Sequence, residues 1–148
     1  MNTPRDAAKG STSTIAAIVI LAIIVGVGAA LAAGYAQGVP PWNAPDEPAH
    51  YNYIRHIATT GQLPELKHGN WDAPLLERLK SAKFPQSESV DSIAYESHQP
   101  PLFYLMATPI YSLTASAPLL ERVHALRRLS VVLATATLLL GFLAVRAI

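Results

Sequence analysis

The sequence contains no cysteine and few charged residues. Of its 148 residues, 14% are Asp, Glu, Lys or Arg, whereas 51% are hydrophobic. The absence of cysteine excludes a disulfide framework, a zinc–thiolate site and a thiol nucleophile. A net charge of +1, with no basic block interleaved with aromatic residues, argues against a nucleic-acid partner. The composition instead indicates a membrane protein whose chemistry would use carboxylates, imidazoles or hydroxyls.

Two long apolar segments predict two transmembrane helices. The first covers residues 14–36, which include no charged residue, and the second covers residues 129–148, where only Arg146 is charged. Each is close to the roughly 20 residues that a helix needs to cross a bilayer. The alternative for the first segment is a cleavable secretory signal, because Arg5 and Lys9 precede it and small residues follow it.

The basic residues suggest an orientation for these helices. Arg5 and Lys9 favour a cytoplasmic tail over residues 1–13, and Arg146 is consistent with a return to that side. We therefore expect an integral protein of the inner or plasma membrane, with residues 37–128 as a large extracytoplasmic loop. Arg122, Arg127 and Arg128 would stand on the outer side, against the charge rule, and would need an anionic partner such as a lipid headgroup or phosphate.

The predicted fold class is therefore an all-α membrane protein whose two spans are joined by a loop that holds interfacial helices. Asp46, Gly61 and Pro64 bound a helix over about 46–60, on which Asp46, His50, Tyr53, Ile54 and Ile57 share one side. A further short helix is expected after an Asp72 cap, followed by an aperiodic and mobile polar stretch up to 92. A second interfacial helix is expected over 100–115, with an apolar stripe and a kink near Pro109.

Asp46 and Glu47 are the sharpest polar feature of the loop. At a helix start one carboxylate can cap the helix while the other projects, although both could simply favour the positive end of the helix dipole. His50 lies four residues after Asp46, so a divalent metal such as magnesium, manganese or calcium stays an open alternative. No serine or threonine has the setting of a hydrolase nucleophile, and no Gly-rich phosphate loop follows a strand.

Three blocks of sequence, in order, resemble a family of membrane enzymes. They read APDEPAHYNYIRHIATTGQLP, YESHQPPLFYLMATPIY and ERVHALRRLSVVLATATLLLGFLAVR. This order resembles the amino-terminal part of C-type integral-membrane glycosyltransferases, which include the protein O-mannosyltransferase-like and aminoarabinose-transferase-like enzymes. The resemblance covers about residues 14–148. It implies transfer of a sugar from a polyprenyl-phosphate carrier to an acceptor at the outer face of the membrane.

The resemblance also implies roles for individual residues. An acidic residue early in the outer loop acts at the catalytic centre of such enzymes, so Asp46 is the expected base or acceptor-orienting carboxylate, with Glu47 supporting it. Arg127 and Arg128 would contact a phosphate, or alternatively would anchor their helix at lipid headgroups. The full expected set of substrate-binding residues is His50, Tyr53, His98, Gln99, Arg127 and Arg128.

Complete members of this family have many more spanning helices than the two predicted here. Two helices alone cannot enclose a polyprenyl phosphate and exclude water, so we expect the isolated chain to be inactive. Two hypotheses follow. The chain is either the amino-terminal module of a larger transferase, or a non-catalytic small membrane subunit that docks on a larger membrane complex.

Overall fold

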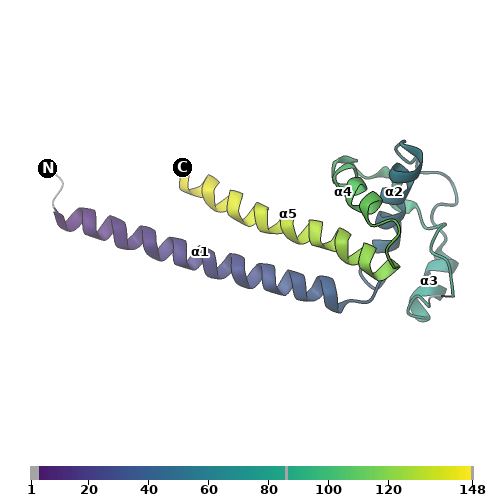
Figure 1. The fold of residues 1–148 in the computed structure, drawn as a ribbon, viewed down its shortest axis with the longest axis horizontal. Coiled ribbons are helices and arrows are strands. Elements are labelled where there is room, and N and C mark those ends of the chain that lie inside the picture. Colours follow the sequence, from purple (N-terminus) through teal and green to yellow (C-terminus); the bar gives the residue numbers. More distant parts are fainter. Residues whose placement is uncertain (1–3, 86, 148) are drawn as a thin grey trace. The chain divides into compact units, whose positions relative to one another are not determined.

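The computed structural model describes residues 4–85 and 87–147, and this part of the chain is helical with no strand. Its elements, in order, are α1 (Pro4–Gly38), α2 (Glu47–Thr60), α3 (Ala73–Ser81), the short 3-10 helix η1 (Tyr95–His98), α4 (Leu102–Leu113) and α5 (Leu119–Ala147) (Figure 1). The all-helical part of the predicted fold class is confirmed for these residues. Residues 1–3 of the expected tail and the last residue of the expected second span lie outside the described residues.

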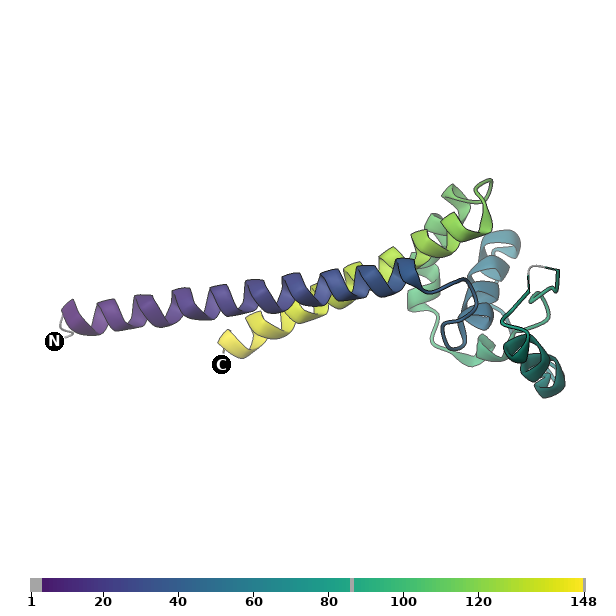
Figure 2. The ribbon, with the colours of Figure 1, turned by 90° about the horizontal axis from the view of Figure 1, so that it is seen from below.

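Two of these helices are long and apolar enough to cross a membrane. The apolar part of α1 is Ile15–Gly38, with a mean hydropathy of 2.9, and α5 has a mean hydropathy of 2.0 in its most apolar window. These two helices favour association with a membrane. Both begin earlier than the apolar runs predict: α1 starts at Pro4, and α5 is one unbroken helix from Leu119 (Figure 2). The arginines expected in a loop before the second span therefore lie on α5 itself.

Residues 36–129 form one compact unit, and α2 lies at its centre. Four successive residues, 51–54, are buried on this helix, so α2 is covered on several sides rather than on one face. Of the side chains predicted to share a face, Tyr53, Ile54 and Ile57 are buried, His50 is half-buried and Asp46 is exposed. The core around α2 consists of Trp42, Ala49, Tyr51, Tyr53, Ile54, Ile57, Leu76, Leu79, Val90, Ile93, Tyr104, Ala107, Tyr111, Val123 and Leu126.

Local signals in the sequence define the ends of the short helices. At the end of α2, Gly61 has φ +70°, and its N–H donates to the Ile57 carbonyl, as a left-handed helix cap does. Asp72 accepts a hydrogen bond from the Leu75 N–H at 2.9 Å, which confirms it as the cap of α3. Asp46 differs from the expectation, because it precedes α2 with φ +59° and its side chain does not cap the helix.

Helix α4 packs its aromatic side against the core. Tyr104, Ala107 and Tyr111 are buried, at the i, i+3, i+7 spacing of one helix face. The predicted apolar stripe lies elsewhere: Leu102 is 71% exposed and Leu105 is 48% exposed. The buried side of α4 therefore consists of two tyrosines and an alanine rather than of these leucines. Pro109 lies inside the helix, which continues to Leu113.

The polar stretch expected to be mobile, which ends at residue 92, contributes Val90 to the core, and Ile93 follows it directly. Val90 and Ile93 are buried, and both of their carbonyls accept hydrogen bonds from the Asn52 side-chain nitrogen, at 2.7 and 2.8 Å. A buried amide that bridges two carbonyls fixes the connection between α3 and η1 against α2. Residue 86 of this stretch is not among the described residues.

Candidate functional site

The two adjacent carboxylates, Asp46 and Glu47, have different environments. Asp46 is exposed and has left-handed backbone angles, φ +59° and ψ +2°, whereas Glu47 is the first residue of α2 and its side chain is only 15% exposed. Left-handed angles are uncommon outside glycine, although aspartate tolerates them better than most residues, and such strain is often held at functional positions. The turn directs the two side chains to separate partners.

Glu47 forms a bidentate ion pair with Arg127 of α5. Arg127 Nε donates to Glu47 Oε1 at 2.6 Å and Nη2 donates to Oε2 at 2.8 Å, with the arginine side chain 11% exposed. Glu47 Oε2 also accepts the backbone N–H of Trp42 at 2.8 Å. Parallel hydrogen bonds of this kind are the strong, geometrically specific form of an arginine–carboxylate pair.

Arg127 also binds the backbone at the end of α1. Its Nη1 donates to the carbonyls of Ala36 at 2.9 Å and Val39 at 2.6 Å, and Nη2 donates to the Pro40 carbonyl at 3.2 Å. Carbonyls in the last turn of a helix lack intrahelical partners, so a cation there satisfies them. Five hydrogen bonds therefore engage the guanidinium that was expected to face a phosphate. Its anionic partner in this structure is Glu47.

Within the described part of the chain, the Asp46 side chain forms one hydrogen bond. The hydroxyl of Tyr95, on η1, donates to Asp46 Oδ1 at 2.7 Å. Burial, and then the hydrogen bond to Asp46, raise the pKa of Tyr95 well above its ordinary value, so the hydroxyl stays a donor. Trp71 packs edge-on against the Tyr95 ring, with the ring centres 4.8 Å apart. Asp46 is thus an exposed carboxylate that is oriented by a tyrosine but bound by no cation among the described residues.

A stack of aromatic side chains connects His50 to the core. His50 Nδ1 and the Tyr104 hydroxyl share a hydrogen bond of 2.8 Å, and the Tyr104 ring lies parallel to Tyr53 with ring centres 3.6 Å apart. Tyr53 in turn donates to the Gln99 carbonyl at 3.2 Å. Burial, with the negative charge of Glu96 adding to it, raises the pKa of Tyr104 to about 12. Two expected substrate-binding residues, His50 and Tyr53, therefore both contact Tyr104 of α4.

The remaining expected site residues have local roles or none. His98 is exposed, and its Nδ1 donates to the Tyr95 carbonyl at 3.0 Å, while Gln99 Nε2 donates to Glu96 at 2.7 Å. Both contacts stabilise η1, which carries the tyrosine that binds Asp46. Arg128 is exposed and forms no ion pair within the described part of the chain.

Arg122 has aromatic rather than acidic neighbours. Its guanidinium carbon lies 6.0 Å from the centre of the Tyr51 ring and 5.8 Å from that of Tyr111. A cation over aromatic faces is stabilised electrostatically without a carboxylate. Its buried Nε has no hydrogen-bond partner in the part of the protein that the structure describes.

The divalent-metal alternative finds no ligand cluster in this arrangement. Among the side chains that the structure describes, those of residues 15–85 and 87–147, no three or more His, Asp or Glu gather closely enough to hold an ion. Asp46 and His50, the pair that suggested such a site, bind Tyr95 and Tyr104 instead.

Sequence reasoning missed the two tyrosines that orient the predicted site. Tyr95 and Tyr104 lie 49 and 54 residues away in the chain from their partners, Asp46 and His50. No helical period connects positions that far apart. The available signal was the position of Tyr95, which opens the second family-like block, and of Tyr104, which lies within it.

Comparison with known proteins gives no relative for this chain. No protein-family model, curated protein sequence or solved structure matches it.

Proposed function

We propose that this chain is the amino-terminal module of a membrane glycosyltransferase, which moves a sugar from a polyprenyl-phosphate carrier to an acceptor at the outer face of the membrane. The observation that carries the proposal is the different pairing of the two adjacent carboxylates. Arg127 neutralises Glu47, whereas Asp46 stays exposed with one tyrosine donor. Of these two carboxylates, Asp46 is therefore the one that can take a proton from the hydroxyl of the molecule that receives the sugar.

The roles follow from these contacts. Asp46 acts as the base or acceptor-orienting carboxylate, because an ionised carboxylate within reach of a hydroxyl can take its proton as the new bond forms. Glu47 acts through structure, since its pair with Arg127 holds the start of α2 and the turn that carries Asp46. The ordered blocks of sequence that resemble C-type glycosyltransferases give the reaction class.

The carrier phosphate requires a cation that is not already paired. Arg127 is occupied by Glu47 and three carbonyls, so we assign the contact to Arg128, which is exposed and follows it directly on α5. His50, Tyr53, His98 and Gln99 stay in the proposed site as the groups around Asp46 and η1. Arginine suits this role because its planar group can donate two parallel hydrogen bonds to a phosphate.

The proposal also requires an orientation and a compartment. Arg5 and Lys9 precede the first span, so we place the amino terminus in the cytoplasm and residues 37–128 outside the inner or plasma membrane. Single cysteines on a sequence that has none of its own allow a direct test. A cysteine at exposed Ser87 should react with a membrane-impermeant maleimide on intact cells, whereas one at Ser11 should react only after lysis. The reverse pattern would contradict the proposal.

The reaction is tested by sugar transfer in native membranes that contain the protein. Asp46→Asn removes the base while keeping the shape, and we expect the transfer of radiolabelled sugar from polyprenyl phosphate to fall by about 10²–10⁴-fold. Arg128→Gln should raise the KM for the polyprenyl-phosphate carrier, with less effect on the maximal rate. If Asp46→Asn transferred sugar at the wild-type rate, with wild-type protein levels, the assignment would be refuted.

A second candidate is a non-catalytic membrane subunit that docks on a larger complex. The outer side of α4 favours it, because Leu102, Leu105, Met106 and Leu113 are exposed, the last at 86%. Contiguous exposed apolar side chains often mark an interaction surface. Purification in mild detergent separates the readings, since a subunit would elute with partner chains. A monodisperse protein of 15.9 kDa that elutes alone would count against this candidate.

A further inference from the structure

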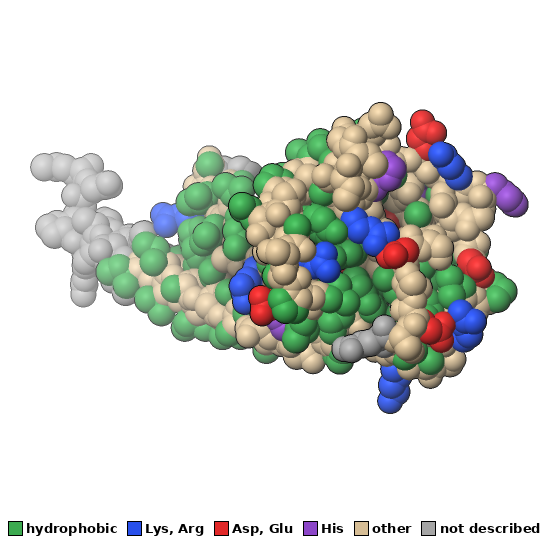
Figure 3. All heavy atoms as spheres, turned by 45° about the vertical axis from the view of Figure 1, so that its right-hand side comes forward, with side chains coloured by type: hydrophobic (Ala, Val, Ile, Leu, Met, Phe, Trp, Pro, Cys, Tyr) green, Lys and Arg blue, Asp and Glu red, His purple; other side chains and the backbone are tan. Residues whose placement is uncertain are grey.

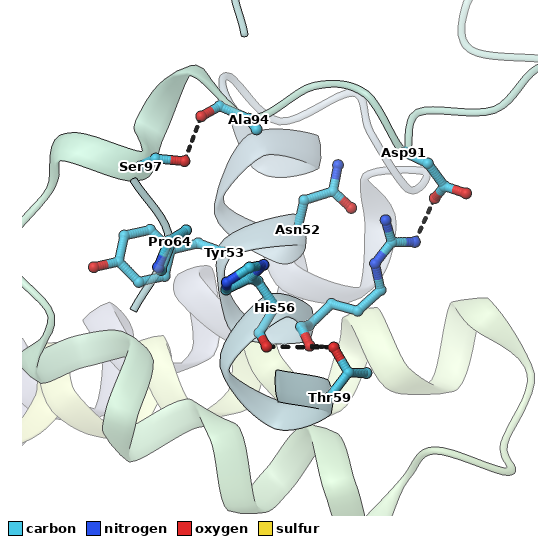
Figure 4. Close-up of a pocket in the computed structure, with 9 residues that line it drawn as sticks. Asn52, Tyr53, His56, Thr59, Pro64, Asp91, Ala94 and Ser97 are labelled. Carbon is cyan, nitrogen blue, oxygen red and sulfur yellow. Dashed lines mark hydrogen bonds and ion pairs between the residues drawn. The ribbon is translucent and has the colours of Figure 1, made fainter. Parts of the chain in front are cut away.

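A small pocket lies against α2, separate from both carboxylates of the proposed site. Its volume is about 230 Å³, and Figure 4 shows the side chains around it. The pocket is smaller than a typical site for a drug-sized molecule but large enough for several waters or one small ring. Its lining residues are Asn52, Tyr53, Arg55, His56, Thr59, Pro64, Asp91, Ala94 and Ser97.

The Asn52 amide gives this pocket an unused hydrogen-bond acceptor. Asn52 is 6% exposed, and its nitrogen is fixed by the carbonyls of Val90 and Ile93. That fixed nitrogen sets the orientation of the amide, so the oxygen faces away from both carbonyls. In Figure 4 the oxygen points toward the side of the pocket where Asp91 lies. Asn52 Oδ1 is buried and has no hydrogen-bond partner among the described residues. Since leaving a buried acceptor unpaired is costly, a ligand that donates a hydrogen bond would be favoured.

The other polar groups suit a ligand without charge. Arg55 and Asp91 neutralise each other in an ion pair at one wall. The His56 ring forms no side-chain hydrogen bond within the described part of the chain, so its two nitrogens can donate and accept. The Thr59 hydroxyl donates to the Arg55 carbonyl at 2.9 Å, which leaves its oxygen able to accept. The lining therefore offers acceptors at Asn52 Oδ1 and Thr59 Oγ1, with donors on His56 and Arg55, and its two opposite charges are paired with each other. On the face of the molecule that Figure 3 draws, basic and acidic side chains are interspersed rather than gathered in one patch.

We propose that this pocket binds a small neutral polyhydroxylated ring, either a free monosaccharide or the terminal sugar of a larger glycan. Hydroxyl groups are the neutral donors that a ring of this size carries in greatest number. They would donate to Asn52 Oδ1 and Thr59 Oγ1 and exchange hydrogen bonds with His56, while Pro64 offers an apolar contact to the ring. The pocket contains neither Asp46 nor Glu47 and stands whether or not the chain transfers sugar.

The test is ligand-observed NMR on the full chain in detergent micelles. The probes are D-glucose, D-mannose and D-galactose, each with its methyl glycoside. We expect saturation transfer to at least one of these sugars, with affinity in the millimolar range. Binding of the methyl glycoside as well as the free sugar would assign the pocket to terminal glycan residues, whereas binding of the free sugar alone would assign it to free monosaccharides.

Matched variants tie the binding to the pocket. Thr59→Val and Thr60→Val each remove a hydroxyl that binds a carbonyl of the same helix, but only Thr59 lines the pocket. We expect the first to weaken sugar binding about fivefold and the second to leave it unchanged. His56→Phe should weaken binding by about tenfold or more, while His68→Phe, at an exposed loop position, should not.

Three outcomes would overturn the inference. The first is the absence of saturation transfer to all six probes when each is present at about 50-fold excess over the protein. The second is equal binding by His56→Phe and wild-type protein, where circular dichroism shows that both are folded. The third is tighter binding of glucose 6-phosphate or glucosamine than of glucose, because a charged ligand would contradict the neutral lining. Transfer activity is not measured in this test, so its failure is independent of the proposed reaction.

Discussion

Removing Arg127 is the perturbation that the structure defines most sharply. Its guanidinium forms five hydrogen bonds, two to Glu47 and three to carbonyls at residues 36, 39 and 40. Breaking a buried ion pair by removing one partner costs about 3–5 kcal/mol. The Arg127 and Glu47 side chains are 11% and 15% exposed, so solvent screens the ion pair in part. We therefore expect Arg127→Ala to lower the free energy of unfolding by about 2–3 kcal/mol.

The assay uses one of the two native tryptophans as a reporter. Trp42 is 8% exposed, and its backbone N–H donates to Glu47, whereas Trp71 is 60% exposed. In a Trp71→Phe background, the emission of Trp42 reports unfolding of this unit during a denaturant titration in detergent. The free energies of Arg127→Ala, Glu47→Ala and the double variant then give the coupling energy, expected at about 1.5–2.5 kcal/mol. Arg127→Lys should lose roughly half the stability lost by Arg127→Ala, because lysine cannot form the parallel pair.

The neighbouring arginine supplies the control. Arg128 is exposed and unpaired among the described residues, so Arg128→Ala should change the free energy of unfolding by less than about 0.5 kcal/mol. Additive effects of Arg127→Ala and Glu47→Ala would refute the reasoning, because two side chains in direct contact cannot act independently. Equal effects of Arg127→Ala and Arg128→Ala would also refute it.

Further predictions concern pH and backbone. The hydrogen bond from Arg55 lowers the pKa of Asp91 below its ordinary value of 3.8, so its small stabilising contribution is present above that value and is lost as the pH falls through the lowered pKa; Arg55→Gln should remove this acid dependence in denaturant titrations. Four of the six tyrosines, Tyr51, Tyr53, Tyr95 and Tyr104, have raised pKa values. Their ionisation, followed by absorbance at 295 nm, should therefore occur above pH 10 in the folded protein and at lower pH after unfolding. A single transition near pH 10 in both states would contradict this. Gly61→Ala should cost about 1 kcal/mol, measured by thermal unfolding, because Gly61 has φ +70°, while Gly61→Asn should cost less, and equal costs would show that backbone strain is not the cause.

The sequence predicted those parts of the fold that depend on neighbouring residues. Long apolar runs predicted two span-length helices, and the Asp72 cap and Gly61 stop are local signals that the structure confirms. The burial of α2 on several sides was not predictable, because it depends on residues that pack from elsewhere in the chain. Asn52 would ordinarily be placed on a polar surface, yet its amide binds carbonyls 38 and 41 residues away.

The candidate site was predictable in composition and not in pairing. Asp46, Glu47 and His50 were identified from residue types close together in sequence. Arg127 was assigned to a phosphate, whereas its partner is Glu47, 80 residues away, and no periodic pattern relates the two positions. Which of two adjacent carboxylates is free depends on such a contact, so only the structure could separate Asp46 from Glu47. Their proposed roles in sugar transfer stay predictions.

The contact between Arg127 and the Ala36 carbonyl brings the two ends of a compact unit together. That unit covers residues 36–129, and the contact joins Nη1 to O at 2.9 Å, 91 residues apart in sequence. A domain whose termini meet can be inserted into a foreign host or reconnected in a new order, since a short linker closes the gap. Residues 36–129 could therefore be grafted onto a soluble helical hairpin, which would make this region accessible to crystallisation without detergent.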